Sequence, residues 1–162
     1  MNTDELEYVG FWARVGASLI DTALILMVVT PIMHFAYGAD YSPDALLGGA
    51  IIKGPVDFIV SWILPAVAVI WFWIARQATP GKMVIAARIV DASTGAPATT
   101  GQLIGRYFAY YVSIIPFLLG LIWVGLDARK QGWHDKLANT VVVRSKNRGV
   151  QPVVFPAEYT KR

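Results

Sequence analysis

The chain has 162 residues, of which 56% are hydrophobic and only 15% are charged, and its formal net charge at pH 7 is +3. This composition argues against an ordinary soluble domain and indicates a chain whose surroundings are mostly lipid. The sequence contains no cysteine, which excludes disulfides, thiolate catalysis and cysteine-ligated metal sites.

The first apolar stretch covers residues 15–37, which is long enough for a helix to cross a bilayer. Arg14, Ser18 and Asp21 are spaced by four and three residues, so they share one face of this helix. A carboxylate inside a span costs about 2.5–3.5 kcal/mol and normally faces other helices or a wet cavity. We therefore expect Asp21 to face the protein. It would either bind a proton or a cation, or form an ion pair with Arg14 or with Arg106 of the third apolar segment.

A second apolar stretch, residues 58–75, predicts a second membrane span. The connecting loop, residues 38–55, is rich in Gly, Pro and Asp and is expected outside. Lys and Arg are concentrated in residues 76–106 and after residue 127. Cytoplasmic segments of membrane proteins carry such an excess, so both termini and the basic segments are expected to be cytoplasmic. This reading also makes a nucleic-acid partner unnecessary.

The third apolar stretch, residues 103–126, is interrupted by Pro116 and Gly120. A straight third span would place the basic tail outside, against the charge rule. It would also separate two β-prone runs, residues 88–91 and 140–144, which we expect to pair as a cytoplasmic antiparallel ribbon. A bent, re-entrant segment resolves both conflicts and is favoured over a third span.

The predicted fold is therefore an all-α membrane protein with two transmembrane helices, a third broken or re-entrant hydrophobic helix and a small two-stranded β ribbon. Residues 1–148 are expected to form a single membrane domain. Residues 149–162 are expected to form a poorly ordered cytoplasmic tail.

Several motifs follow one another in a specific order. They are Phe11-Trp12-Ala13-Arg14 with Asp21, the turn Thr79-Pro80-Gly81-Lys82, the run Arg88-Ile89-Val90-Asp91, Gly105-Arg106, and the closing segment from Asp127 to Thr140. In this order and spacing they resemble the RDD family of small bacterial membrane proteins, which is named for one arginine and two aspartates. The second aspartate would be Asp127 or Asp135. The resemblance implies a multi-pass protein of the bacterial cytoplasmic membrane.

The resemblance also implies transport, with sodium/proton-type exchange as the leading function and Asp21 as the group that binds the ion. The alternative is a non-transporting scaffold or accessory module that anchors partner proteins in the bilayer. Two or three hydrophobic segments are few to enclose a pathway for monovalent cations and protons, so a pathway would require a homo-oligomer.

A second group of polar residues lies outside the spans, and we expect it to lock the tail against residues 76–91. Its members are Lys82, Asp127, Arg129, His134, Asp135 and Lys136. No Ser or Cys nucleophile is arranged with His134, and the two histidines are far apart in the sequence. The sequence therefore predicts no enzymatic activity, no metal and no cofactor.

Overall fold

Two long helical segments form the part of the molecule that can cross a membrane. The computed structural model describes residues 6–38 and 54–146, so the expected tail of residues 149–162 lies outside the described residues. The first segment, α1 (Phe11–Tyr37), has 27 residues, or about 40 Å at 1.5 Å per residue. The second runs from Pro55 to Val84, and both segments are long and apolar enough to span a bilayer, as predicted.

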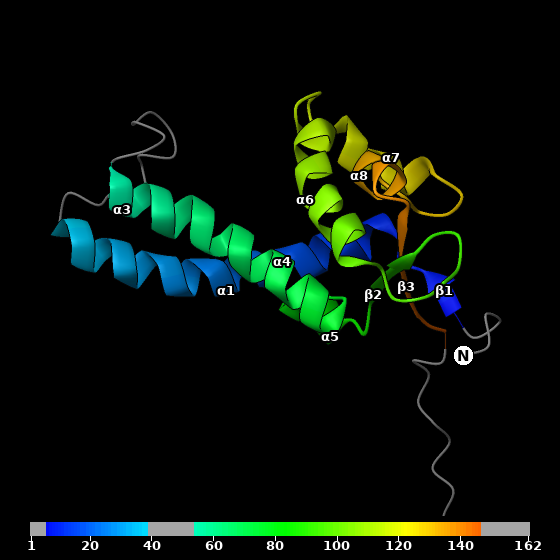
Figure 1. Ribbon diagram of the computed structural model, residues 1–162, viewed down its shortest axis with the longest axis horizontal. Helices are drawn as coiled ribbons and strands as arrows, with labels where there is room; N and C mark the ends of the chain where they lie inside the picture. Colours follow the sequence, from blue (N-terminus) through cyan, green and yellow to red (C-terminus); the bar gives the residue numbers. More distant parts are fainter. Residues whose placement is uncertain (1–5, 39–53, 147–162) are drawn as a thin grey trace, which may run out of the picture.

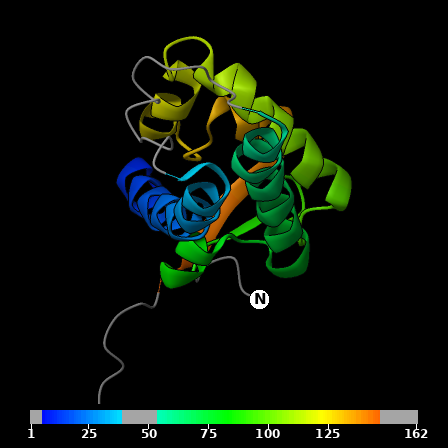
Figure 2. The same ribbon diagram turned by 90° about the vertical axis from the view of Figure 1, so that its left-hand side faces the viewer.

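The second segment is assembled from four helical pieces, which are α3 (Pro55–Phe58), η3 (Ile59–Ile63), α4 (Leu64–Arg76) and α5 (Pro80–Val84). The piece η3 is π-helical, and its last bond runs from the N–H of Leu64 to the carbonyl of Ile59. Pro65 follows immediately and has no N–H to donate, which accounts for an irregular turn at this place. Figures 1 and 2 show α1 and α4 side by side, and α5 packs against the N-terminal part of α1.

The third apolar stretch is bent, as predicted. It consists of α6 (Thr100–Ile114) and α7 (Leu119–Leu126), which meet at 100°. The bend passes through Phe117 and Leu118, whose φ angles are positive (52° and 63°). Gly120 then packs against the backbone of Ser113, where an added Cβ would lie 2.6 Å from the Ser113 Cα. In Figure 1, α6 crosses the direction of α1 and α4 rather than running beside them.

A small antiparallel sheet lies at one end of the molecule. Strand β2 (Arg88–Asp91) pairs with β3 (Thr140–Ser145), with Arg88 opposite Val143 and Asp91 opposite Thr140, so the predicted ribbon is confirmed. The expectation of two strands is wrong, because β1 (Leu6–Tyr8) pairs with the other edge of β3 and gives the order β1-β3-β2. Since β2 precedes α6 and β3 follows α7, the pairing returns both ends of the bent segment to the same end of the molecule.

The distribution of side chains is that of a protein surrounded by lipid. Arg106 and Asp135 are completely buried, whereas the side chains of Phe35 and Phe117 are 94% and 91% exposed. Along α6 the polar side chains of Arg106 and Ser113 are buried together with Leu103 and Ala109, while large apolar side chains such as Phe108 point outward. Polar groups turned inward and apolar groups turned outward are what a hydrocarbon solvent favours.

Candidate functional site

Asp135 is the buried carboxylate to which both arginines bind. It belongs to α8 (Trp133–Leu137), a short helix that precedes β3. The Nη1 atom of Arg14 donates to Asp135 Oδ2 at 2.6 Å, and Nη1 of Arg106 contacts the other oxygen, Oδ1. The backbone N–H of Gly132 also donates to Oδ2, at 3.0 Å. We call Arg14, Arg106 and Asp135 the Asp135 centre.

This arrangement corrects the expected ion pair of Asp21 with Arg14 or Arg106, because both guanidinium groups are held by Asp135 instead. Burial by itself would raise the pKa of Asp135, but the positive charges of Arg106 and Arg14 lower it by more. The pKa of Asp135 is therefore well below the usual value of an aspartate. Asp135 is therefore ionised at any physiological pH. The seven-residue offset between Arg14 and Asp21 corresponds to roughly 10 Å along the helix, which leaves Arg14 free to turn toward α8.

His134 packs beside this centre as a neutral group. Its ring stacks on Tyr110 with centroids 3.9 Å apart, and its Nδ1 lies 3.2 Å from Ser113 Oγ. The same hydroxyl accepts from the backbone N–H of His134 at 3.0 Å. A serine therefore does lie beside this imidazole, which corrects the expectation that none would. Burial lowers the pKa of His134 to about 3, against an opposing effect of Asp135. An imidazole in this environment does not exchange protons near neutral pH.

Three other members of the expected polar group, Asp127, Arg129 and Lys136, lie nearer the surface. Lys136 Nζ binds Asp127 Oδ1 at 2.5 Å, and Arg129 donates to the carbonyl of Ala92 at 2.5 Å, just after β2. The hydrogen bond from Lys136 lowers the pKa of Asp127. The group is therefore divided, with His134 and Asp135 in the interior and Asp127, Arg129 and Lys136 outside it.

Asp21 forms a second polar centre with the turn that follows α4. Thr79 Oγ1 donates to Asp21 Oδ2 at 2.6 Å, and the N–H of Gly81 donates to Oδ1 at 2.7 Å. Lys82, which is only 6% exposed, donates through Nζ to the same Thr79 hydroxyl at 3.4 Å. The hydroxyl of Thr79 thus connects the carboxylate to the ammonium group. We call Asp21, Thr79, Gly81 and Lys82 the Asp21 centre.

Gly81 allows this approach because it has no side chain. A Cβ on Gly81 would lie 2.0 Å from the carbonyl oxygen of Ala17, which is fully buried in α1. The motif Thr-Pro-Gly-Lys was visible in the sequence, but its pairing with Asp21 was not. A carboxylate inside a membrane span needs hydrogen-bond donors, and a turn that contains Gly can supply them from its backbone. This requirement was the signal that could have predicted the pairing of Asp21 with the turn.

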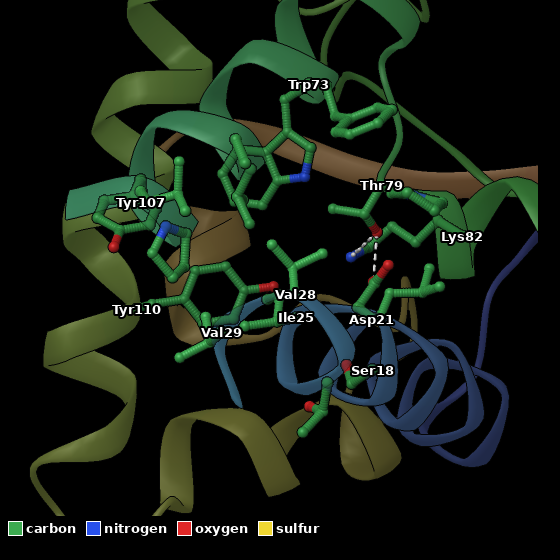
Figure 3. Close-up of a pocket in the computed structure, with 18 residues that line it drawn as sticks. Ser18, Asp21, Ile25, Val28, Val29, Trp73, Thr79, Lys82, Tyr107 and Tyr110 are labelled. Atoms are coloured by element: carbon green, nitrogen blue, oxygen red, sulfur yellow. Dashed lines mark hydrogen bonds between the residues drawn. The ribbon is translucent and has the colours of Figure 1, made fainter. Parts of the chain in front are cut away.

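The Asp21 centre borders a cavity of about 470 Å³ between α1, α4, α5 and α6, which falls in the size range of ligand sites. Figure 3 shows Asp21, Thr79 and Lys82 on one side of it, Tyr107 and Tyr110 on the other, and Trp73 above. Most other lining side chains are apolar, among them Ile25, Val29, Leu64 and Phe72. Ser18 also lines the cavity, whereas Arg14 and Arg106 belong to the Asp135 centre.

Two further features describe the chemistry of this cavity. The indole Nε1 of Trp73 is buried and has no hydrogen-bond partner in the described part of the chain. Lys82 Nζ lies 5.9 Å from the centre of the Trp73 ring, a cation–π distance. Within residues 6–38 and 54–146, no three His, Asp or Glu side chains gather in a way that could hold a metal ion.

One family model matches most of the chain. The model of the RDD family matches residues 8–139. An uncharacterized protein YxaI of Bacillus subtilis is 29% identical over 152 residues, which cover 83% of this chain and 95% of that protein. No solved structure matches the chain.

Two other relatives match over a shorter region. The uncharacterized protein RP437 of Rickettsia prowazekii is 40% identical over 76 residues, which cover 47% of this chain and 42% of that protein. A proline-rich antigen homolog of Mycobacterium tuberculosis is 29% identical over 92 residues, 52% of this chain and 38% of that protein. The matched region therefore spans less than half the length of these two relatives.

Proposed function

The chain belongs to the RDD family, and from this premise we propose that it is a transporter that exchanges protons for monovalent cations of the sodium type. The proposed location is the cytoplasmic membrane of a bacterium, with the N-terminus and the basic segments on the cytoplasmic side. Two features support this location: the two apolar helices, and the excess of Lys and Arg at the end that carries the sheet.

The observation that carries the proposal is the environment of the Asp21 carboxylate. Its two hydrogen bonds within the described residues come from neutral donors, the Thr79 hydroxyl and the Gly81 N–H. An ionised carboxylate has about four lone-pair positions, so about two remain for a cation or a proton. Asp21 also lines the cavity, which gives an ion a way to reach it. The carboxylate of Asp135, by contrast, is occupied by two arginines.

Exchange follows from competition for one carboxylate. A proton bound to Asp21 blocks the cation, and a bound cation blocks the proton, so one ion is released as the other binds. Both occupied states carry the same net charge, so the surrounding protein need not change its own charge. When neither ion is present, Thr79 donates a hydrogen bond to the bare carboxylate and accepts one from Lys82.

A complete pathway would be formed between copies of the chain. The two apolar helices leave most of their side chains exposed, including Leu26, Met27 and Val67, and two helices do not enclose a polar path across about 30 Å of hydrocarbon. We therefore propose a homo-oligomer in which the Asp21 cavity of each copy opens toward its neighbour.

The test is ion flux in vesicles that contain only the purified protein. A pH gradient, followed with an enclosed fluorescent dye, should collapse when sodium is added outside. Asp21→Asn should abolish this response while folded protein still accumulates, and Asp127→Asn, which removes a carboxylate far from the cavity, should leave it unchanged. Wild-type flux in Asp21→Asn, or no flux from the unmodified protein, would refute the proposal.

The second candidate function is a scaffold that anchors partner proteins. It is favoured by the exposed basic side chains at the sheet end, such as Arg129 and Lys136, which offer a surface to acidic partners. This function predicts a partner that copurifies with the chain and no ion flux from the protein alone. The vesicle experiment therefore separates the two candidates.

A further inference from the structure

The charged side chains around the end of the cavity near Lys82 are unequal in number. Among the described residues, three basic side chains and two carboxylates lie here: the buried Lys82 and Arg106 and the partly exposed Arg14, against the partly exposed Asp21 and the buried Asp135. The neighbouring imidazole of His134 is neutral and does not change this sum. With Lys82 protonated, the formal charges of these five groups sum to one positive charge. An uncompensated charge in a protein interior is costly, which indicates that an anion belongs here.

The excess charge coincides with hydrogen-bond donors that have too few acceptors. Lys82 carries three N–H bonds, but within the described residues its ammonium makes one hydrogen bond, at 3.4 Å to Thr79. The Nε1 of Trp73, a side chain that is 2% exposed, has no acceptor among these residues. In Figure 3 the indole nitrogen faces the side of the cavity on which Thr79 and Lys82 lie. Both donors line the same cavity.

The rest of the cavity is shaped for a hydrocarbon chain. On α1 its lining extends from Ser18 to Val29, eleven residues or about 17 Å along the helix axis. On the other side it follows α4 from Trp73 back to Leu64. This direction is parallel to the two candidate spans, as acyl chains are in a bilayer. Its wall includes exposed apolar side chains such as Leu24, so the surrounding lipid can reach it.

We propose that the cavity binds an anionic phospholipid, with its phosphate at Lys82 and Trp73 and one acyl chain between α1 and α4. Lys82 lies near the end of the second candidate span, which ends at Val84, and this is the depth at which lipid headgroups are found. A phosphodiester carries one negative charge, which equals the excess. Zwitterionic lipids bring a compensating cation and would leave the imbalance in place.

This inference does not rest on cation exchange and would stand if the protein moved no ion. A phosphate at Lys82 would also affect the proposed exchange, because it would neutralise the ammonium that otherwise opposes a cation at Asp21. Bound lipid and ion flux can therefore be measured separately on the same preparation.

The test uses the full chain, purified in detergent, with phosphatidylglycerol as the probe. Native mass spectrometry should show about one phosphatidylglycerol retained per chain, and the lipid should raise the midpoint of thermal unfolding. Phosphatidylcholine with the same acyl chains should do neither. Inorganic phosphate at the same concentration should also fail, because it has no chain to fill the cavity.

Two variants address the two ends of the cavity. Lys82→Gln should weaken phosphatidylglycerol binding about tenfold or more, as expected for loss of a charge-assisted contact. Lys136→Gln, which removes an equal charge from the surface pair with Asp127, should bind as the unmodified protein does. Ala68→Phe fills the apolar part of the cavity and should reduce retention while Lys82 is kept.

The outcomes that overturn the proposal are equally specific. Unchanged binding in both Lys82→Gln and Ala68→Phe would place the lipid elsewhere on the protein. Equal stabilisation by phosphatidylcholine would remove the charge argument, and competition by inorganic phosphate would show that the acyl chain is not part of the ligand. If Lys82→Gln does not fold, the Ala68→Phe variant and the comparison between lipids decide the question.

Discussion

The Asp135 centre allows a prediction about stability with a magnitude taken from the structure. Asp135→Asn keeps the size of the side chain but removes its negative charge. Arg106, which is fully buried, would then retain a hydrogen bond to Thr140 Oγ1 at 2.9 Å but no counter-charge. Arg14, whose side chain is 11% exposed, would lose the same partner. Leaving a buried cation unpaired costs about 3–5 kcal/mol, a large part of the stability of a typical domain.

The matched control is Asp127→Asn. Asp127 also pairs with a cation, but the side chain of Lys136 is 46% exposed, so water can replace the interaction. Pairs of this kind contribute at most about 1 kcal/mol. The two variants make the same chemical change, from aspartate to asparagine, at positions eight residues apart in the sequence. Only Asp135→Asn, at the buried carboxylate, should lower the free energy of unfolding by several kcal/mol.

The assay is reversible unfolding in mixed detergent micelles, followed by far-ultraviolet circular dichroism. Adding Arg106→Met to Asp135→Asn should restore part of the lost free energy of unfolding, because the unpaired buried charge is then removed. A loss in Asp135→Asn no larger than in Asp127→Asn would refute the argument. It would mean that the buried arginines find other compensation.

Three further predictions concern packing, pH and topology. Gly81→Ala should lower the free energy of unfolding by about 3 kcal/mol, because the added Cβ would meet the backbone of α1. The control Gly16→Ala, whose Cβ meets nothing within 4 Å, should leave the free energy of unfolding unchanged. Equal unfolding midpoints for the two variants would contradict this prediction. Burial lowers the pKa of His134 to about 3 in the folded protein, whereas the imidazole of the unfolded chain has a pKa near 6.5. As the pH falls below 6.5, the unfolded chain therefore binds a proton that the folded protein does not bind. The free energy of unfolding at pH 5 should consequently be about 2 kcal/mol lower than at neutral pH. His134→Gln should flatten this dependence, and an unchanged slope would exclude the imidazole as its cause. Cysteines at Ser93 and Ser145 should both be protected from a membrane-impermeant reagent added to intact cells; labelling of only one would contradict the pairing of β2 with β3.

Local features of the sequence determined most of the architecture. The length of the two apolar stretches predicted two spans, because a bilayer has a fixed thickness and a helix a fixed rise. The distribution of Lys and Arg, together with Pro116 and Gly120, predicted the bend of the third segment. The pairing of the strands at residues 88–91 and 140–144 was predicted from β-prone runs that had to lie on one side. The strand β1 was missed because three residues are too short to show a pattern.

Only the tertiary structure decided which charges meet. Arg14 and Asp135 are separated by 121 residues, and no periodicity relates two positions that far apart. Asp21 lies on the same helical face as Arg14, but helix spacing alone fixes only direction, whereas an ion pair requires contact within about 4 Å. The packing of α8 brought Asp135 to both arginines, and the close approach of Gly81 gave Asp21 neutral donors instead. A long side chain binds the partner that packing brings nearest, and packing depends on the whole chain.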